Sequence, residues 1–156
     1  MAKFAVVGSG AWGTALAAHA ARLGHAVTRW ALEAEVAEEI TTRHINSIYL
    51  PDLPLPESLR ASSDVATAVA GADVVILVPP SSHLRSVATK VAPALGPETL
   101  VVVATKGIEE GSLKLMSEVL AETVPGLGDR LAFLSGPSFA KEVARGLPTD
   151  VVVASE

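Results

Sequence analysis

The chain has 156 residues, enough for one domain with a sizeable hydrophobic core. Its composition, 49% hydrophobic with a net charge of −5, excludes a disordered chain and any overall attraction for nucleic acid. It contains no cysteine, which excludes disulfides, thiolate metal sites and covalent thioester chemistry, and favours a cytoplasmic protein.

A glycine-rich turn follows the first apolar run of the chain. A strand is expected at residues 3–7, then Gly8, Gly10 and Gly13, then an alanine-rich helical stretch at residues 15–23. In a dinucleotide site the first glycine permits a tight turn, the second lets backbone approach a pyrophosphate, and the third lets helix and strand pack closely. The N-terminus of the following helix offers free N–H groups to an anion. The spacing therefore predicts a dinucleotide-binding loop.

An acidic residue follows the second predicted strand, at residues 26–31. Glu33 lies 20 residues after Gly13, the spacing at which the ribose-binding acid of a Rossmann unit belongs. A carboxylate suits a free ribose 2′-hydroxyl and repels a 2′-phosphate, so Glu33 favours NAD over NADP. Arg29 and Arg43 are cations within reach of such a phosphate, so the predicted cofactor is NAD or NADP with a preference for NAD.

Valine-rich apolar runs alternate with helical stretches along the rest of the chain. Further strands are expected at residues 59–61, 73–78, 100–104, 130–134 and 150–154, and helices at residues 33–42, 65–70, 81–95, 112–124 and 139–145. This alternation predicts an α/β fold, a Rossmann-type doubly wound, mostly parallel sheet with helices on both faces. The apolar runs are too short for a membrane span. Residues 44–57 and 135–140 are longer or less regular than a connection requires.

Ligands of an open parallel sheet bind beyond the carboxyl ends of the strands. Lys106 follows five almost wholly apolar residues and precedes a glycine, so it either points into this crevice or is a solvated loop lysine. Ser138, with Gly136 before it, either holds an anion or hydroxyl group or is an ordinary helix N-cap. Arg85 either reaches a phosphate or is a solvated helix charge, and Trp12 either covers the cofactor or packs on the sheet. The four histidines lack metal-ligand spacing, so no metal site is expected.

Several longer motifs occur in one order over the whole chain. They lie at residues 8–16, 46–51, 78–85, 106–109, 134–143 and 147–149. In this combination the chain resembles the N-terminal, cofactor-binding domain of the NAD(P)-dependent sn-glycerol-3-phosphate dehydrogenases, most closely the bacterial soluble enzyme. On this resemblance residues 1–156 form one dinucleotide-binding domain, and the family's C-terminal helical domain is absent from the chain.

The resemblance implies hydride transfer between NAD(P)H and dihydroxyacetone phosphate, which gives the sn-glycerol 3-phosphate used in phospholipid synthesis. Lys106 would contact both cofactor and substrate and polarise the substrate C2 oxygen. From spacing and resemblance together, the expected cofactor residues are Gly8, Gly10, Ala11, Trp12, Gly13, Glu33, Lys106 and Ala140, and the expected substrate residues are Lys106, Gly136 and Ser138.

The resemblance also limits what this chain is expected to do alone. In the family, a lysine of the C-terminal domain transfers the proton, so we expect this chain to bind dinucleotide weakly and to turn over little or nothing. Its partner would be a small-molecule substrate, and a homodimer of the full-length protein is compatible with the resemblance. Other 2-hydroxyacid-type Rossmann dehydrogenases share the opening strand-turn-helix but do not explain the motifs at residues 106–109 and 135–140. A nucleotide-binding module without chemistry is the alternative from another class.

Overall fold

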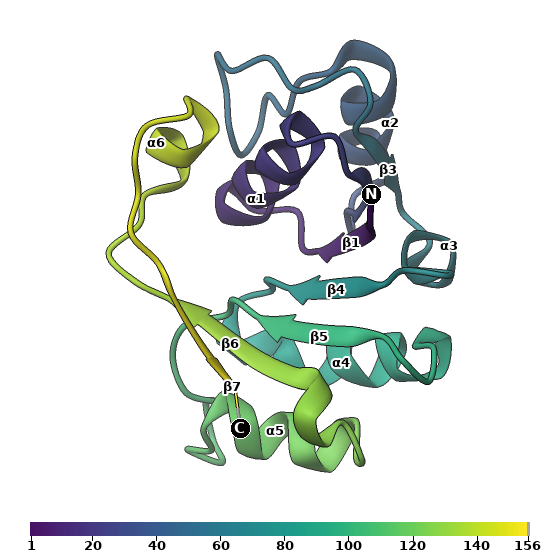
Figure 1. Cartoon of the computed structure of the whole chain (residues 1–156), viewed down its shortest axis with the longest axis vertical. Helices are drawn as coiled ribbons and strands as arrows, with labels where there is room; N and C mark the ends of the chain where they lie inside the picture. Colours follow the sequence, from purple (N-terminus) through teal and green to yellow (C-terminus); the bar gives the residue numbers. More distant parts are fainter. Residues whose placement is uncertain (156) are drawn as a thin grey trace.

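A computed structural model describes residues 1–155, which form one seven-stranded sheet (Figure 1). The strands are β1 (Lys3–Val7), β2 (Ala26–Trp30), β3 (Arg60–Ser62), β4 (Val74–Leu77), β5 (Leu100–Val103), β6 (Leu131–Ser135) and β7 (Val152–Ser155). Their order across the sheet is β3-β2-β1-β4-β5-β6-β7. The pairs from β3 to β6 are parallel, and β7 pairs antiparallel with β6. The predicted doubly wound, mostly parallel sheet is confirmed.

Helices cover both faces of the sheet. They are α1 (Ala11–Arg22), α2 (Ala34–Arg43), α3 (Val65–Val69), α4 (Leu84–Val91), α5 (Met116–Thr123) and α6 (Ala140–Ala144). Because successive strand residues point to opposite faces, Val6 packs with α1 and α2, whereas Val7 packs with α3, α4 and α5. Helix α6 lies against α1, where Ala15 meets Val143. None of the helices within residues 1–155 has both the length and the apolar character that a membrane crossing needs.

The segment before α5 corrects the prediction of a helix from residue 112. Residues 108–115 form a tight turn instead, in which Ile108 bridges Leu115 and Leu113 adopts a left-handed φ of 58°. Leu113 is 72% exposed, so it does not lie on a buried helix face. The helix begins at Met116 because the Glu118 carboxylate accepts the N–H of Leu115 at 2.8 Å and closes the first turn.

Candidate functional site

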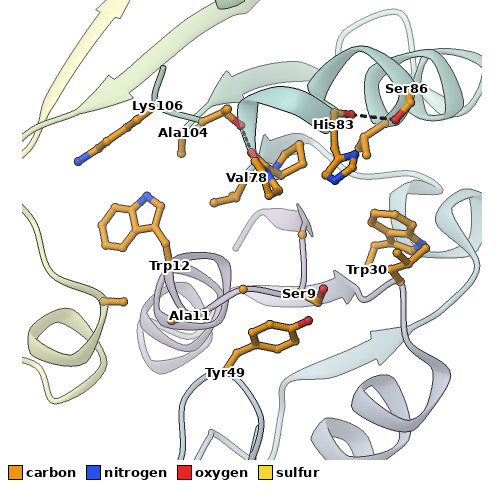
Figure 2. Close-up of a pocket in the computed structure, with 18 of the residues that line it drawn as sticks. Ser9, Ala11, Trp12, Trp30, Tyr49, Val78, His83, Ser86, Ala104 and Lys106 are labelled. Carbon is orange, nitrogen blue, oxygen red and sulfur yellow. Dashed lines mark hydrogen bonds between the residues drawn. The ribbon is translucent and has the colours of Figure 1, made fainter. Parts of the chain in front are cut away.

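A cavity of about 690 Å³ opens at the carboxyl ends of β1, β2, β4 and β5 (Figure 2). Its lining comes from segments far apart in sequence: Gly8–Trp12, Trp30, Leu32, Tyr49, Val78–Pro80, His83, Ser86, Val87, Lys90, Ala104–Lys106, Ser138 and Ala140. Figure 2 shows the indole of Trp12 pointing into the cavity, with Lys106 on the same side. The place agrees with the rule that open parallel sheets bind ligands at this edge.

The glycine turn at the start of α1 fits tightly between two strands. Gly8 has a φ of 144°, and a Cβ there would lie 2.8 Å from the carbonyl oxygen of Val78. A Cβ on Gly13 would lie 2.8 Å from the carbonyl oxygen of Gly8, so α1 approaches β1 as closely as backbone allows. Gly10 has no atom within 4 Å of its Cβ position. The first and third glycines are therefore required by packing, and the second leaves open space at the cavity wall.

Unpaired donors surround this cavity. Within residues 1–155, the backbone N–H groups of Ser9, Gly10 and Ala11 have no hydrogen-bond acceptor. Among the residues that the structure describes, the indole N–H of Trp12 and the hydroxyl of Ser138 are also buried without a hydrogen-bond partner. Buried polar groups are normally satisfied, so these donors indicate a polar ligand, and the backbone donors at a helix N-terminus fit an anion. The residues present fit the diphosphate of a dinucleotide.

The irregular segment at residues 44–57 folds over the glycine turn. The buried Asn46 donates from Nδ2 to the Thr14 hydroxyl at 2.9 Å and to the carbonyl oxygen of Ser9 at 3.4 Å, and its Oδ1 accepts the N–H of Tyr49 at 3.1 Å. Tyr49 then donates its hydroxyl to Glu33 Oε1 at 2.8 Å. Asn46 thus fixes Tyr49 at the cavity wall. Residues 46–51 are among the motifs of the resemblance, which assigns them no role.

Glu33 lies at the N-terminus of α2, beside the cavity but not among its lining residues. The hydrogen bond from Tyr49 holds the pKa of Glu33 below its ordinary value, so this side chain is an ionised carboxylate at neutral pH. Its Oε2 is buried and has no partner among the described residues. An acceptor oxygen is therefore available beside the cavity, and the expected ribose contact stays a prediction.

The two arginines expected near a 2′-phosphate do not lie at the cavity. Arg29 is fully buried and donates to the carbonyl oxygens of Gly8 and Gly10, which corrects the expectation that it reaches a cofactor phosphate. Arg43 is on α2, where it pairs with Glu39 at 3.7 Å and is largely exposed. Neither residue lines the cavity. The preference for NAD over NADP stays a prediction.

Lys106 and the segment after β6 come together across the cavity mouth. Lys106 Nζ donates to the carbonyl oxygen of Gly136 at 2.8 Å, and the same oxygen accepts the N–H of Ser138 at 3.0 Å. Gly136 has a φ of 137°, and a Cβ there would lie 2.8 Å from the carbonyl oxygen of Asp150. Ala140 also lines the cavity. The expected substrate residues thus form one cluster with an ammonium group at its centre.

Arg85 anchors the loop that carries Lys106. It donates from Nε and Nη2 to the two carboxylate oxygens of Glu109, both at 2.8 Å, and pairs with Glu122 at 2.8 Å. Ser112 adds a hydrogen bond to Glu109 at 2.5 Å. Nε and Nη2 of Arg85 thus face carboxylates rather than a phosphate, although its side chain is 38% exposed. It joins α4, α5 and the loop after Lys106.

We expect the stability of the fold to depend on the charge of Glu109 in acid. The hydrogen bond from Arg85 lowers the pKa of Glu109 to about 2. A carboxylate whose pKa is depressed by folding stabilises the protein above its unfolded value of 4.5, and this contribution is lost as the pH falls toward 2. The free energy of unfolding, measured with urea between pH 7 and pH 3, should therefore fall more steeply for the parent than for Glu109→Gln. At pH 7 the variant should be less stable than the parent. The neighbouring exposed Glu110→Gln serves as the control, and equal slopes for all three proteins would contradict the expectation.

The chain matches known proteins over its full length. A sequence profile described as NAD-dependent glycerol-3-phosphate dehydrogenase N-terminus matches residues 3–156. A protein from Corynebacterium aurimucosum named glycerol-3-phosphate dehydrogenase, NAD(P)+, is 51% identical over 154 residues, which cover 99% of this chain and 46% of that protein. The crystal structure of glycerol-3-phosphate dehydrogenase from Coxiella burnetii superposes with a TM-score of 0.89 at 37% identity, covering 99% of this chain and 46% of the other.

Another class of Rossmann protein matches less well. A ketopantoate reductase from Ralstonia eutropha has a TM-score of 0.66 at 26% identity, over 85% of this chain and 41% of the other. The chain spans about half the length of the curated relatives it matches. Since the profile covers nearly every residue, the chain belongs to the NAD-dependent glycerol-3-phosphate dehydrogenase family and corresponds to its N-terminal part.

Proposed function

We propose that residues 1–156 form a dinucleotide-binding domain that takes NAD(H) across the cavity and serves hydride transfer between dihydroxyacetone phosphate and sn-glycerol 3-phosphate. The observation that carries the proposal is the set of unpaired N–H donors from Ser9 to Ala11 in the cavity that Lys106 also lines. The relatives' names support the same activity.

The chain's own residues would bind and orient both ligands. The turn from Gly8 to Gly13 and the side chain of Trp12 would hold the diphosphate, Ala140 would contact the nicotinamide end, and Glu33 would accept from the ribose. A bound nicotinamide supplies or accepts the hydride. The ammonium of Lys106 would stabilise the negative charge that develops on the C2 oxygen of the substrate, since it is held in place by Gly136.

We expect the parent chain to bind NADH more tightly than NADPH. The ionised Glu33 repels a 2′-phosphate, and at the effective dielectric of a protein surface one repelled charge changes the Kd by about tenfold. Isothermal titration should give this ratio for the parent and a ratio near unity for Glu33→Ala. Glu35→Ala, two residues further along in the first turn of α2, is the matched control and should keep the parent ratio. Equal constants in the parent would contradict the preference, and no measurable NADH binding would contradict the proposed function.

Other features of the whole enzyme stay predictions from the sequence and the resemblance. They are a small-molecule substrate with no nucleic-acid partner, a homodimer, a cytoplasmic location, and proton transfer by a lysine outside this chain. The net charge of −5 supports the expectation about nucleic acid. We expect this chain alone to oxidise NADH with dihydroxyacetone phosphate slowly or not at all.

A further inference from the structure

Arg29 places a positive charge directly behind the glycine turn. It lies on β2 opposite Val6 of β1, with no exposed surface. Its Nε and Nη2 donate to the carbonyl oxygen of Gly8 at 2.9 and 2.8 Å, and Nη2 also lies 3.2 Å from the carbonyl oxygen of Gly10. The guanidinium thus contacts the carbonyl groups of the turn from inside the fold, and Arg29 is not among the cavity-lining residues.

The two carbonyl groups belong to the peptides whose N–H groups lie at the cavity. The Gly8 carbonyl shares its peptide with the N–H of Ser9, and the Gly10 carbonyl shares its peptide with the N–H of Ala11. In a planar trans peptide the two groups point in opposite directions, so an arginine on the carbonyl side leaves the N–H directed away from it. A hydrogen bond to a carbonyl polarises its peptide and strengthens the N–H as a donor. Both N–H groups lack an acceptor within residues 1–155.

The charge of Arg29 is only partly compensated inside the fold. Desolvation by burial lowers its pKa to about 10, with Glu33 acting in the opposite direction. Its Nη1 is buried and has no hydrogen-bond partner in the described part of the chain. A buried cation without a directly bonded carboxylate is costly, and an anion bound on the other side of the turn would offset part of this cost.

We propose that Arg29 is a positioning residue for the cofactor, which acts through the carbonyl groups of Gly8 and Gly10 to strengthen binding of the dinucleotide diphosphate. The proposal rests on the proposed function, since it requires an anion at the cavity face of the turn. It differs from a purely structural role in one respect. A structural arginine would affect every ligand of the cavity, whereas this one would affect those that carry a diphosphate.

The test compares ADP-ribose with adenosine in the parent, Arg29→Met and Arg29→Lys, with Kd measured by isothermal titration and folding followed by urea unfolding. Arg29→Met should raise the Kd of ADP-ribose by about tenfold, the scale of one buried charge at an effective protein dielectric. The Kd of adenosine should change by less than about twofold. Arg29→Lys keeps the charge but loses the two-pronged contact, so its ADP-ribose affinity should fall between the other two. This variant also serves if Arg29→Met fails to fold.

Four outcomes separate the hypotheses. Equal losses for both ligands would overturn the proposal in favour of a structural role, as would unchanged ADP-ribose affinity in folded Arg29→Met. If Arg29→Met does not fold, a lysine variant that binds both ligands like the parent would overturn it as well. A parent that binds neither ADP-ribose nor NADH would instead overturn the proposed function.

Discussion

Alanine at position 8 should abolish measurable NADH binding and destabilise the chain by about 2–4 kcal/mol. The φ of 144° at Gly8 is one that L side chains rarely adopt, and the added Cβ would lie 2.8 Å from the backbone oxygen of Val78. Relief of this contact requires β1 and the end of β4 to separate, which moves the whole turn. Because the bound conformation needs the turn intact, strain of about 2–3 kcal/mol corresponds to about a 100-fold rise in Kd. Isothermal titration and urea unfolding measure the two effects.

Two other alanine variants separate the loss of binding from the loss of stability. Gly10→Ala meets no atom within 4 Å, so it should fold like the parent yet weaken NADH, because its Cβ occupies the space where the diphosphate approaches. Gly24→Ala also meets no atom within 4 Å but has a φ of 86°, so it should cost stability without changing the Kd. Parent-like NADH affinity in both Gly8→Ala and Gly10→Ala would show that the dinucleotide binds elsewhere.

Methionine at position 106 should weaken the binding of sn-glycerol 3-phosphate by about 10- to 100-fold, the range expected for one charge-assisted hydrogen bond. Methionine keeps much of the length of the side chain but removes the ammonium that lies 2.8 Å from the carbonyl oxygen of Gly136. The measurement is a titration of glycerol 3-phosphate into the chain saturated with NAD. The affinity for ADP-ribose, which lacks the nicotinamide, should change by less than about threefold because the glycine turn is untouched.

The matched control for this variant is Lys3→Met. Lys3 lies at the amino end of β1, whereas the cavity opens at the carboxyl ends of the strands. Its Nζ donates to the carbonyl oxygen of Ala70 at 2.6 Å, so removal of this ammonium should leave both affinities unchanged. Unchanged glycerol 3-phosphate affinity in Lys106→Met would remove Lys106 from the substrate site. A parent with no measurable affinity for glycerol 3-phosphate would place the substrate site outside these residues.

The sheet and the glycine turn could be predicted because their causes are local. Runs such as residues 74–78 are apolar and rich in β-branched residues, which favours a strand buried on both faces wherever it lies in the fold. The glycines at 8, 10 and 13 report steric requirements of their own backbone. The crevice followed from these elements, because the carboxyl ends of parallel strands must share one edge of the sheet.

Arg29 could not be placed in the same way. A lone arginine in a short strand is normally a surface residue, and nothing within the strand indicates a buried one. Its partners are carbonyl groups 19 and 21 residues away, which become neighbours only when β1 and β2 pair. The turn before α5 escapes prediction for a related reason. Glu109 accepts the N–H of Leu113 and donates its own N–H to the carbonyl oxygen of Lys114, and helical spacing reveals neither bond nor the left-handed φ of Leu113.

The carbonyl oxygen of Gly8 links the packing of residues 8, 13 and 29. It accepts hydrogen bonds from Nε and Nη2 of Arg29 and lies 2.8 Å from the place where a Cβ of residue 13 would stand. A larger residue at 13 would displace this oxygen from Arg29, whereas an apolar residue at 29 would free it to move. Substitutions at 8, 13 and 29 should therefore be non-additive, and a double-mutant cycle between 13 and 29 would yield a coupling free energy that single substitutions do not reveal.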